Sequence, residues 1–236
     1  MQPFKAAVVQ TAPVFLNRDA TIEKAAGIVK EAAKSGAQLV VFPETLVPTY
    51  PIWLWYLKPA SFDQIPALHA EMLRESVDLS KDHLRPLQEA AKECGCVVTI
   101  GINELNSESS SATLMNTYVC IAETGEILGK RRKLMPTGPE RMAHGVGDGS
   151  TLGTFQTSLG NLGTLICWEN YMPLARYAIY AQGAEVLLTP TWDESSVWEA
   201  SMRHVAKEGR AYVLNSTIAM RLDEIPERYR FRSLLN

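Results

Sequence analysis

The chain has 236 residues, of which 46% are hydrophobic and 21% are charged, and its formal net charge is −3. This length suits one large domain with a sizeable core, or two small ones. The slightly acidic charge argues against a nucleic-acid surface, and no apolar run is long enough to span a bilayer. The amino terminus has no signal-peptide pattern, so we expect a soluble, cytoplasmic protein without a nucleic-acid or membrane partner.

The cysteines and histidines argue against disulfides and metals. Four cysteines, at positions 94, 96, 120 and 167, contain no CxxC pair and lack the density of a secreted scaffold. We therefore expect reduced thiols. The four histidines lie far apart in the sequence and show no metal-ligand spacing. There is also no P-loop, so we expect neither a metal nor another cofactor.

The first elements are predicted to alternate between strand and helix. Residues 6–9 form a continuous apolar run, which is typical of a strand buried on both faces. Asn17 and Asp19 can cap a helix whose apolar residues recur at helical spacing until Gly36. Residues 39–42 form a second buried strand. A strand, a helix and a strand in this order indicate an α/β fold.

The segment that follows the second strand is rich in aromatic residues. Glu44 comes directly after the strand, and residues 48–56 are interrupted by prolines. An aromatic loop beyond a strand end suits a pocket wall and equally suits packing over the sheet edge. Residues 58–80 show no clear pattern, and we expect irregular structure with some helix.

The second half of the chain mixes hairpins with strand–helix units. Helical spacing over residues 84–94 ends at Gly95, and residues 97–100 are predicted to form a strand. Two hairpins are predicted, one between 114–122 and 127–133 and one between 152–157 and 162–167. A long functional loop is expected over 136–150. A helix after Pro173, a strand at 186–189, a helix at 197–208 and a strand at 212–215 complete one layered α/β domain.

Three predicted strands end at a reactive residue: Glu44, Lys133 and Cys167. A thiol nucleophile needs a base, and it needs a cationic or hydrogen-bonding group where negative charge develops. A helix that begins after Cys167 would favour its thiolate. Each residue also has a plain interpretation, as a capping carboxylate, a solvated lysine or a buried core thiol. The residues alone leave both interpretations open.

Three segments resemble the signature segments of the nitrilase, or carbon–nitrogen hydrolase, superfamily. These are Phe-Pro-Glu44, Arg-Arg-Lys133-Leu-Met-Pro-Thr and Leu-Ile-Cys167-Trp-Glu-Asn-Tyr-Met-Pro, in the order in which the superfamily has them. The similarity runs from Ala6 to about Asn215. It is closer to the nitrilase branch than to the amidase branches.

The resemblance implies an α-β-β-α sandwich of the nitrilase type, with mixed sheets covered by helices. It implies a single carbon–nitrogen hydrolase domain over residues 1–236 that lacks a C-terminal segment, in subunits that form homodimers or larger spiral homo-oligomers. The implied reaction converts an organic nitrile to a carboxylic acid and ammonia. An amidase of the same superfamily and a non-catalytic assembly subunit are the alternatives.

The resemblance also implies roles for individual residues. Cys167 would attack the nitrile carbon to form a thioimidate and then a thioester, and Glu44 would act as the base. Lys133 and the backbone N–H of Trp168 would stabilise negative charge. Glu140 matches a second glutamate that positions Lys133 or the substrate.

Candidate pocket walls are Tyr50, His144, Trp168 and Trp192, each with plain packing as the alternative. His144 stands where nitrilases usually have tryptophan, which bears on the shape of the pocket and hence on substrate preference.

Overall fold

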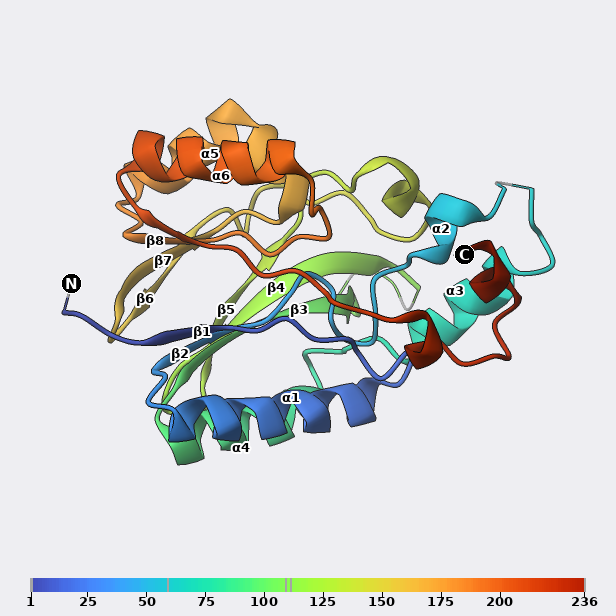
Figure 1. The fold of residues 1–236 in the computed structure, drawn as a ribbon, viewed down its shortest axis with the longest axis horizontal. Helices are drawn as coiled ribbons and strands as arrows, with labels where there is room; N and C mark the ends of the chain where they lie inside the picture. Colours follow the sequence, from blue (N-terminus) through green and yellow to red (C-terminus); the bar gives the residue numbers. More distant parts are fainter. Residues whose placement is uncertain (1, 59, 109, 111, 236) are drawn as a thin grey trace.

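The computed structural model describes residues 2–58, 60–108, 110 and 112–235, and it contains two β-sheets that face each other (Figure 1). The strands of the first sheet lie in the order β1 (Ala6–Val8), β2 (Leu39–Val41), β3 (Val97–Leu105), β4 (Leu114–Ile121), β5 (Ile127–Arg132). The strands of the second lie in the order β6 (Thr154–Thr157), β7 (Gly160–Thr164), β8 (Val186–Leu188), β9 (Tyr212–Leu214).

Both sheets are mixed. Strands β1, β2 and β3 are parallel, and β4 and β5 continue the first sheet as antiparallel strands. In the second sheet β6 is antiparallel to β7, whereas β7, β8 and β9 are parallel. The two predicted hairpins are therefore confirmed as β4–β5 and β6–β7. The second has a tighter turn than expected, because Gly160 has a φ of +117° and pairs directly with Thr157.

Four long helices cover the outer faces of the sheets (Figure 1). Helices α1 (Arg18–Lys34) and α4 (Arg85–Cys94) lie along the first sheet, and α5 (Pro173–Ala181) and α6 (Ser196–Gly209) lie along the second. The side chain of Asn17 accepts the Ala20 N–H and caps α1, as predicted. Gly95 ends α4 in the left-handed conformation, with a φ of +61°. The predicted α-β-β-α layering is confirmed.

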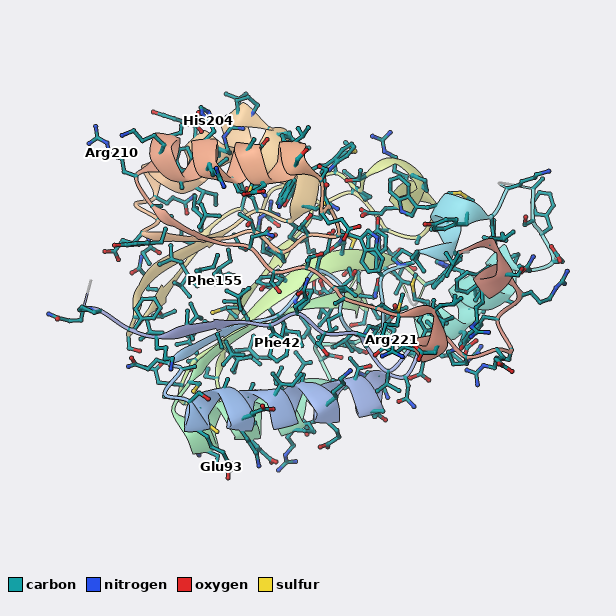
Figure 2. All side chains as sticks on the ribbon, in the orientation of Figure 1. Phe42, Glu93, Phe155, His204, Arg210 and Arg221 are labelled. Atoms are coloured by element: carbon teal, nitrogen blue, oxygen red, sulfur yellow. The ribbon has the colours of Figure 1, made fainter. Side chains whose placement is uncertain are left out.

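Apolar side chains fill the space between each pair of layers. Leu39 and Val41 of the first sheet pack against Leu162 and Phe155 of the second, and Figure 2 shows Phe155 between the sheets. Separate clusters join α1 and α4 to the first sheet and α5 and α6 to the second. Each fully buried large apolar side chain contributes about 1.5–3 kcal/mol, so these layers hold the two sheets in a fixed relation.

A smaller cluster closes one end of the sandwich. It contains the short helix α2 (Trp53–Tyr56), helix α3 (Ile65–Arg74) and the 3₁₀ helix η5 (Arg230–Leu234), packed around Phe15. The aromatic segment at 48–56 is therefore partly helical, and the helix expected within 58–80 is α3. Four further 3₁₀ helices are η1 (Asp82–Leu84), η2 (Gly138–Met142), η3 (Cys167–Tyr171) and η4 (Leu222–Glu224). Across the described residues, no helix combines the length and hydropathy that crossing a bilayer requires.

Candidate active site

Glu44, Lys133 and Glu140 meet in the interior of the molecule. The Lys133 Nζ donates to Glu44 Oε1 at 2.8 Å and to Glu140 Oε2 at 2.8 Å. All three side chains are fully buried. One cation between two carboxylates compensates most of the cost of burying these charges, and it leaves one negative charge in excess.

The fold places these three residues at the ends of elements. Glu44 lies three residues beyond the end of β2, and a Cβ at Gly101 on the neighbouring strand would lie 2.3 Å from the Thr45 nitrogen. Only glycine therefore lets the turn that carries Glu44 approach β3. Lys133 follows β5, and its backbone N–H bonds the Asn116 carbonyl at 2.8 Å. Glu140 lies inside η2 within the predicted loop.

Glu140 is held by backbone as well as by Lys133. Its Oε2 accepts the Thr137 N–H at 2.9 Å, and the Thr137 side chain completes a capping box at the start of η2. Burial opposes ionisation of Glu140, but Lys133 and this N–H outweigh it and lower its pKa below the ordinary value. Glu140 is therefore a fixed carboxylate that keeps Lys133 charged.

The pKa of Glu44 is shifted in the opposite direction to that of Glu140. Burial and the charge of Glu140 raise its pKa above the ordinary value, against the opposing effect of Lys133. Its Oε1 accepts from Lys133 and, at 2.8 Å, from the Asn116 side chain. Its Oε2 is buried and has no hydrogen-bond partner among the residues that the structure describes. Glu44 therefore presents one free oxygen with raised basicity, which is what a general base needs.

Cys167 does not end a strand, which corrects the predicted strand over 162–167. Strand β7 stops at Thr164, and Cys167 is the first residue of η3, with a φ of +53°. Its backbone N–H bonds the Pro190 carbonyl at 2.8 Å, and its carbonyl accepts from the Asn170 side chain at 2.8 Å. A non-glycine residue in this conformation costs about 1–2 kcal/mol, so these bonds hold a strained turn that aims the thiol.

The Cys167 thiol is buried and protonated at rest. Burial and the charge of Glu44 raise its pKa to about 12, while Lys133 acts in the opposite direction. A helix that begins after Cys167 would favour the thiolate, as the sequence indicated, but burial acts in the opposite direction and is the largest cause of the raised pKa. The sulfur accepts from Thr191 Oγ1 at 3.1 Å and from the Trp192 backbone, so its own proton is free for a base.

Tyr50 and Trp192, two of the expected pocket walls, stack on each other. Their ring centroids lie 4.7 Å apart with an interplanar angle of 12°. The Tyr50 hydroxyl donates to Glu140 Oε1 at 2.7 Å and accepts from the Trp55 indole at 3.0 Å. Tyr50 therefore links the aromatic segment to the charged cluster, a contact that the sequence pattern did not indicate.

His144 is buried beside Asn103. Its Nε2 lies 2.6 Å from Asn103 Oδ1, and the Asn103 amide nitrogen donates to the carbonyls of Val47 and Thr49. Since the Asn103 oxygen must accept, His144 carries its proton on Nε2. Its Nδ1 is buried and has no partner in the described part of the chain, and burial lowers the pKa of His144 to about 4. The imidazole is therefore neutral at pH 7.

Trp168 lies at the surface of this region. Its indole is about half-exposed and donates to Asp193 Oδ2 at 2.9 Å. The structure thus places its ring outside the buried charged cluster. Its backbone N–H belongs to the first turn of η3, where N–H groups have no partner within the helix.

Two further residues of the site were not singled out from the sequence. Asn116 donates to Glu44, and Thr191 donates to Cys167. A signal for Asn116 was present, since β4 is buried along its whole length and a polar side chain there needs a partner. Thr191 gave no local signal, because the parallel pairing of β7 and β8 brings it to the cysteine.

Comparison with known proteins places the chain in a family. Residues 5–225 match the model described as carbon-nitrogen hydrolase, so the chain belongs to the carbon–nitrogen hydrolase family. It is 42% identical to an aliphatic nitrilase of Sinorhizobium fredii, over 96% of this chain and 73% of the relative. It is 37% identical to a nitrilase of Bradyrhizobium diazoefficiens, over 96% of this chain and 70% of the relative.

A solved structure confirms the fold. The Nit3 protein of Saccharomyces cerevisiae, a member of the nitrilase superfamily, superposes with a TM-score of 0.76 over 93% of this chain and 77% of its own. The sequence identity of that pair is 22%, so the superposition shows the fold and nothing about the activity. The family match confirms the predicted superfamily, and the superposition confirms the predicted sandwich.

Proposed function

We propose that the protein is a nitrilase that hydrolyses an organic nitrile to the carboxylic acid and ammonia. The observation that carries this proposal is the free Oε2 of Glu44, a buried base of raised pKa within electrostatic reach of the protonated Cys167 thiol. The names of the two bacterial relatives support a nitrile as the substrate.

In the first step Glu44 Oε2 removes the proton from Cys167, and the thiolate attacks the nitrile carbon. A C–S bond forms, one π bond of the nitrile breaks, and its nitrogen takes up a proton to give a thioimidate. Lys133 and the Trp168 N–H stabilise the negative charge that develops on nitrogen. The attack needs this base because a thiol of pKa about 12 supplies almost no thiolate at neutral pH.

The later steps use the same groups. Glu44 activates a water molecule that adds to the thioimidate carbon, and the C–N bond breaks to release ammonia and leave a thioester. A second water, activated in the same way, breaks the C–S bond to give the acid and restore the thiol. Glu140 keeps Lys133 charged and in place throughout.

We assign the pocket wall to Tyr50, Trp192, His144 and the backbone of Trp168, with the half-exposed ring of Trp168 at its outer rim. The support is that Tyr50 and Trp192 stack beside Glu140 and Cys167, while the unpartnered Nδ1 of His144 supplies a neutral acceptor. A flat aromatic wall of this kind accommodates an apolar nitrile tail.

A panel of nitriles tests the proposal directly. Aliphatic, arylaliphatic and aromatic nitriles and their matched amides are incubated with the protein, ammonia is measured, and products are identified by chromatography. We expect nitriles to give acids with the wild type and with the matched control Cys94→Ala, and Cys167→Ala to give none. Turnover of amides alone would establish the amidase alternative. No turnover of either by the folded protein would favour an assembly subunit.

We also propose that the chain forms one domain that assembles into homodimers or larger spirals in the cytoplasm. The support for assembly is a set of large apolar side chains on α5 and α6 that remain exposed: Leu174, Tyr177 and Val197. One cooperative unfolding transition and a dimeric or larger mass by light scattering are the expected results. A monomer at micromolar concentration would contradict the assembly.

A further inference from the structure

A second buried ion pair lies next to the charged cluster. Arg131 Nη2 lies 2.6 Å from Glu169 Oε1, and both side chains are completely buried. The cationic run at 130–133 is therefore not a solvated patch. Arg131 precedes Lys133 by two positions, and Glu169 follows Cys167 by two positions.

The Glu169 carboxylate also bonds the backbone on both sides of the site. Its Oε1 accepts the Leu134 N–H at 2.5 Å, and its Oε2 accepts the Ile166 N–H at 2.7 Å. Leu134 is the residue after Lys133, and Ile166 is the residue before Cys167. One carboxylate thus spans the segment that carries the ammonium and the segment that carries the thiol.

We propose that Glu169 is a positioning residue that fixes Lys133 relative to Cys167, and that Arg131 orients its carboxylate. Lys133 extends from the first sheet and Cys167 from the second, so a tie between the sheets is needed at this point. The turn at Cys167 is strained, with a φ of +53°, and η3 is only five residues long. Glu169 supplies an anchor at the start of that turn.

The geometry requires a carboxylate of this length. Three donors converge on Glu169: a guanidinium and two backbone N–H groups. A glutamine would turn its NH₂ towards at least one of these donors, and an aspartate is one methylene too short to reach both backbones. Glu104 provides a matched comparison, because it is a buried carboxylate paired with Lys130 and bonds neither Leu134 nor Ile166.

The proposal is tested by the alkylation rate of Cys167. Glu169→Gln and Glu169→Asp are treated with iodoacetamide at pH 9, and alkylation of the Cys167 and Cys94 peptides is followed by mass spectrometry alongside thermal unfolding. We expect Cys167 to react about tenfold more slowly, because a displaced Lys133 no longer favours its thiolate. Alkylation of Cys94 should not change. The matched Glu104→Gln variant should unfold at a lower temperature with an unchanged Cys167 rate.

A double variant separates positioning from charge balance. Arg131→Met/Glu169→Met removes both buried charges and is expected to remain folded, yet to keep the slow alkylation because both backbone anchors are lost. A wild-type Cys167 rate in this variant, or in a folded Glu169→Gln, would overturn the proposal.

The effect on turnover rests on the proposed function, whereas alkylation does not. In Glu169→Asp we expect kcat for a nitrile to fall with KM nearly unchanged. Failure of the wild type to hydrolyse nitriles would refute the proposed function and leave the alkylation test intact.

Discussion

The ammonium of Lys133 lies 2.8 Å from Glu44 Oε1, and both side chains are fully buried. Ion pairs in protein interiors gain little stability, because desolvation offsets most of the attraction between the charges. The second oxygen of Glu44 has no hydrogen-bond partner within the described ranges. The pair therefore adds little to the stability of the fold. The free oxygen of Glu44 is available to act as the base.

Replacement of Glu44 by glutamine tests that role. The variant keeps the side-chain shape, but its amide cannot take the proton of the Cys167 thiol. We expect kcat/KM for nitrile hydrolysis to fall by about a thousandfold, in the range of a lost general base. Initial rates of ammonia release measure it, with circular dichroism as the control for folding. A variant that kept a tenth of the activity would show that another group removes the proton.

Neutralising Glu140 should move the pH dependence of the reaction. The charge of Glu140 raises the pKa of Glu44, so Glu140→Gln lowers that pKa. Activity requires ionised Glu44 and is lost as pH falls through its pKa, so the acid limb of kcat/KM should shift to lower pH. Rates of nitrile hydrolysis across pH 4–8 measure this shift. The maximal kcat/KM should also be lower, because Lys133 loses one of its two carboxylate partners. A shift towards higher pH would contradict the coupling.

Tyr50 should act through its hydroxyl as well as its ring. Tyr50→Phe keeps the stacking on Trp192 but removes the hydrogen bond to Glu140. A hydrogen bond to a charged group contributes about 1.5–3 kcal/mol, so we expect roughly a tenfold or greater loss of kcat. The exposed neighbour provides the control, since Tyr56→Phe should have wild-type kinetics. Equal activity of both variants would make the Tyr50 hydroxyl dispensable.

Burial of His144 should make the free energy of unfolding depend on pH. Its pKa is lowered from 6.5 to about 4 in the folded protein, so the unfolded chain binds a proton that the native state does not bind. Its contribution to the free energy of unfolding should therefore decline as pH falls from 6.5 to about 4, by about 3 kcal/mol in total. Urea unfolding of the wild type and His144→Gln across this range measures the difference. Parallel pH profiles would contradict it.

The sequence predicted the parts of the site that lie in recognisable segments. Glu44, Lys133 and Glu140 were predicted together, and the structure brings them within hydrogen-bond distance. The end of β7 was misplaced because the apolar run continues through Leu165 and Ile166 into Cys167, where the backbone turns to a φ of +53° and η3 begins.

The contacts that position the site were not predictable from local pattern. Arg131 belongs to a basic run that normally faces solvent, but in the structure it is buried and paired with Glu169, which lies 38 positions later in the sequence. The pairing of Tyr50 with Glu140 depends likewise on how α2 packs against η2.

Trapping a covalent intermediate shows whether Cys167 is the nucleophile of the reaction. The protein is mixed with an excess of nitrile, quenched in acid within one turnover, digested and analysed by mass spectrometry. We predict that the Cys167 peptide gains the mass of the nitrile as a thioimidate, or of its acyl group as a thioester, and that Cys167→Ala gains neither. Nitrile hydrolysis by Cys167→Ala at the wild-type rate, without an adduct in either protein, would exclude Cys167 as the nucleophile.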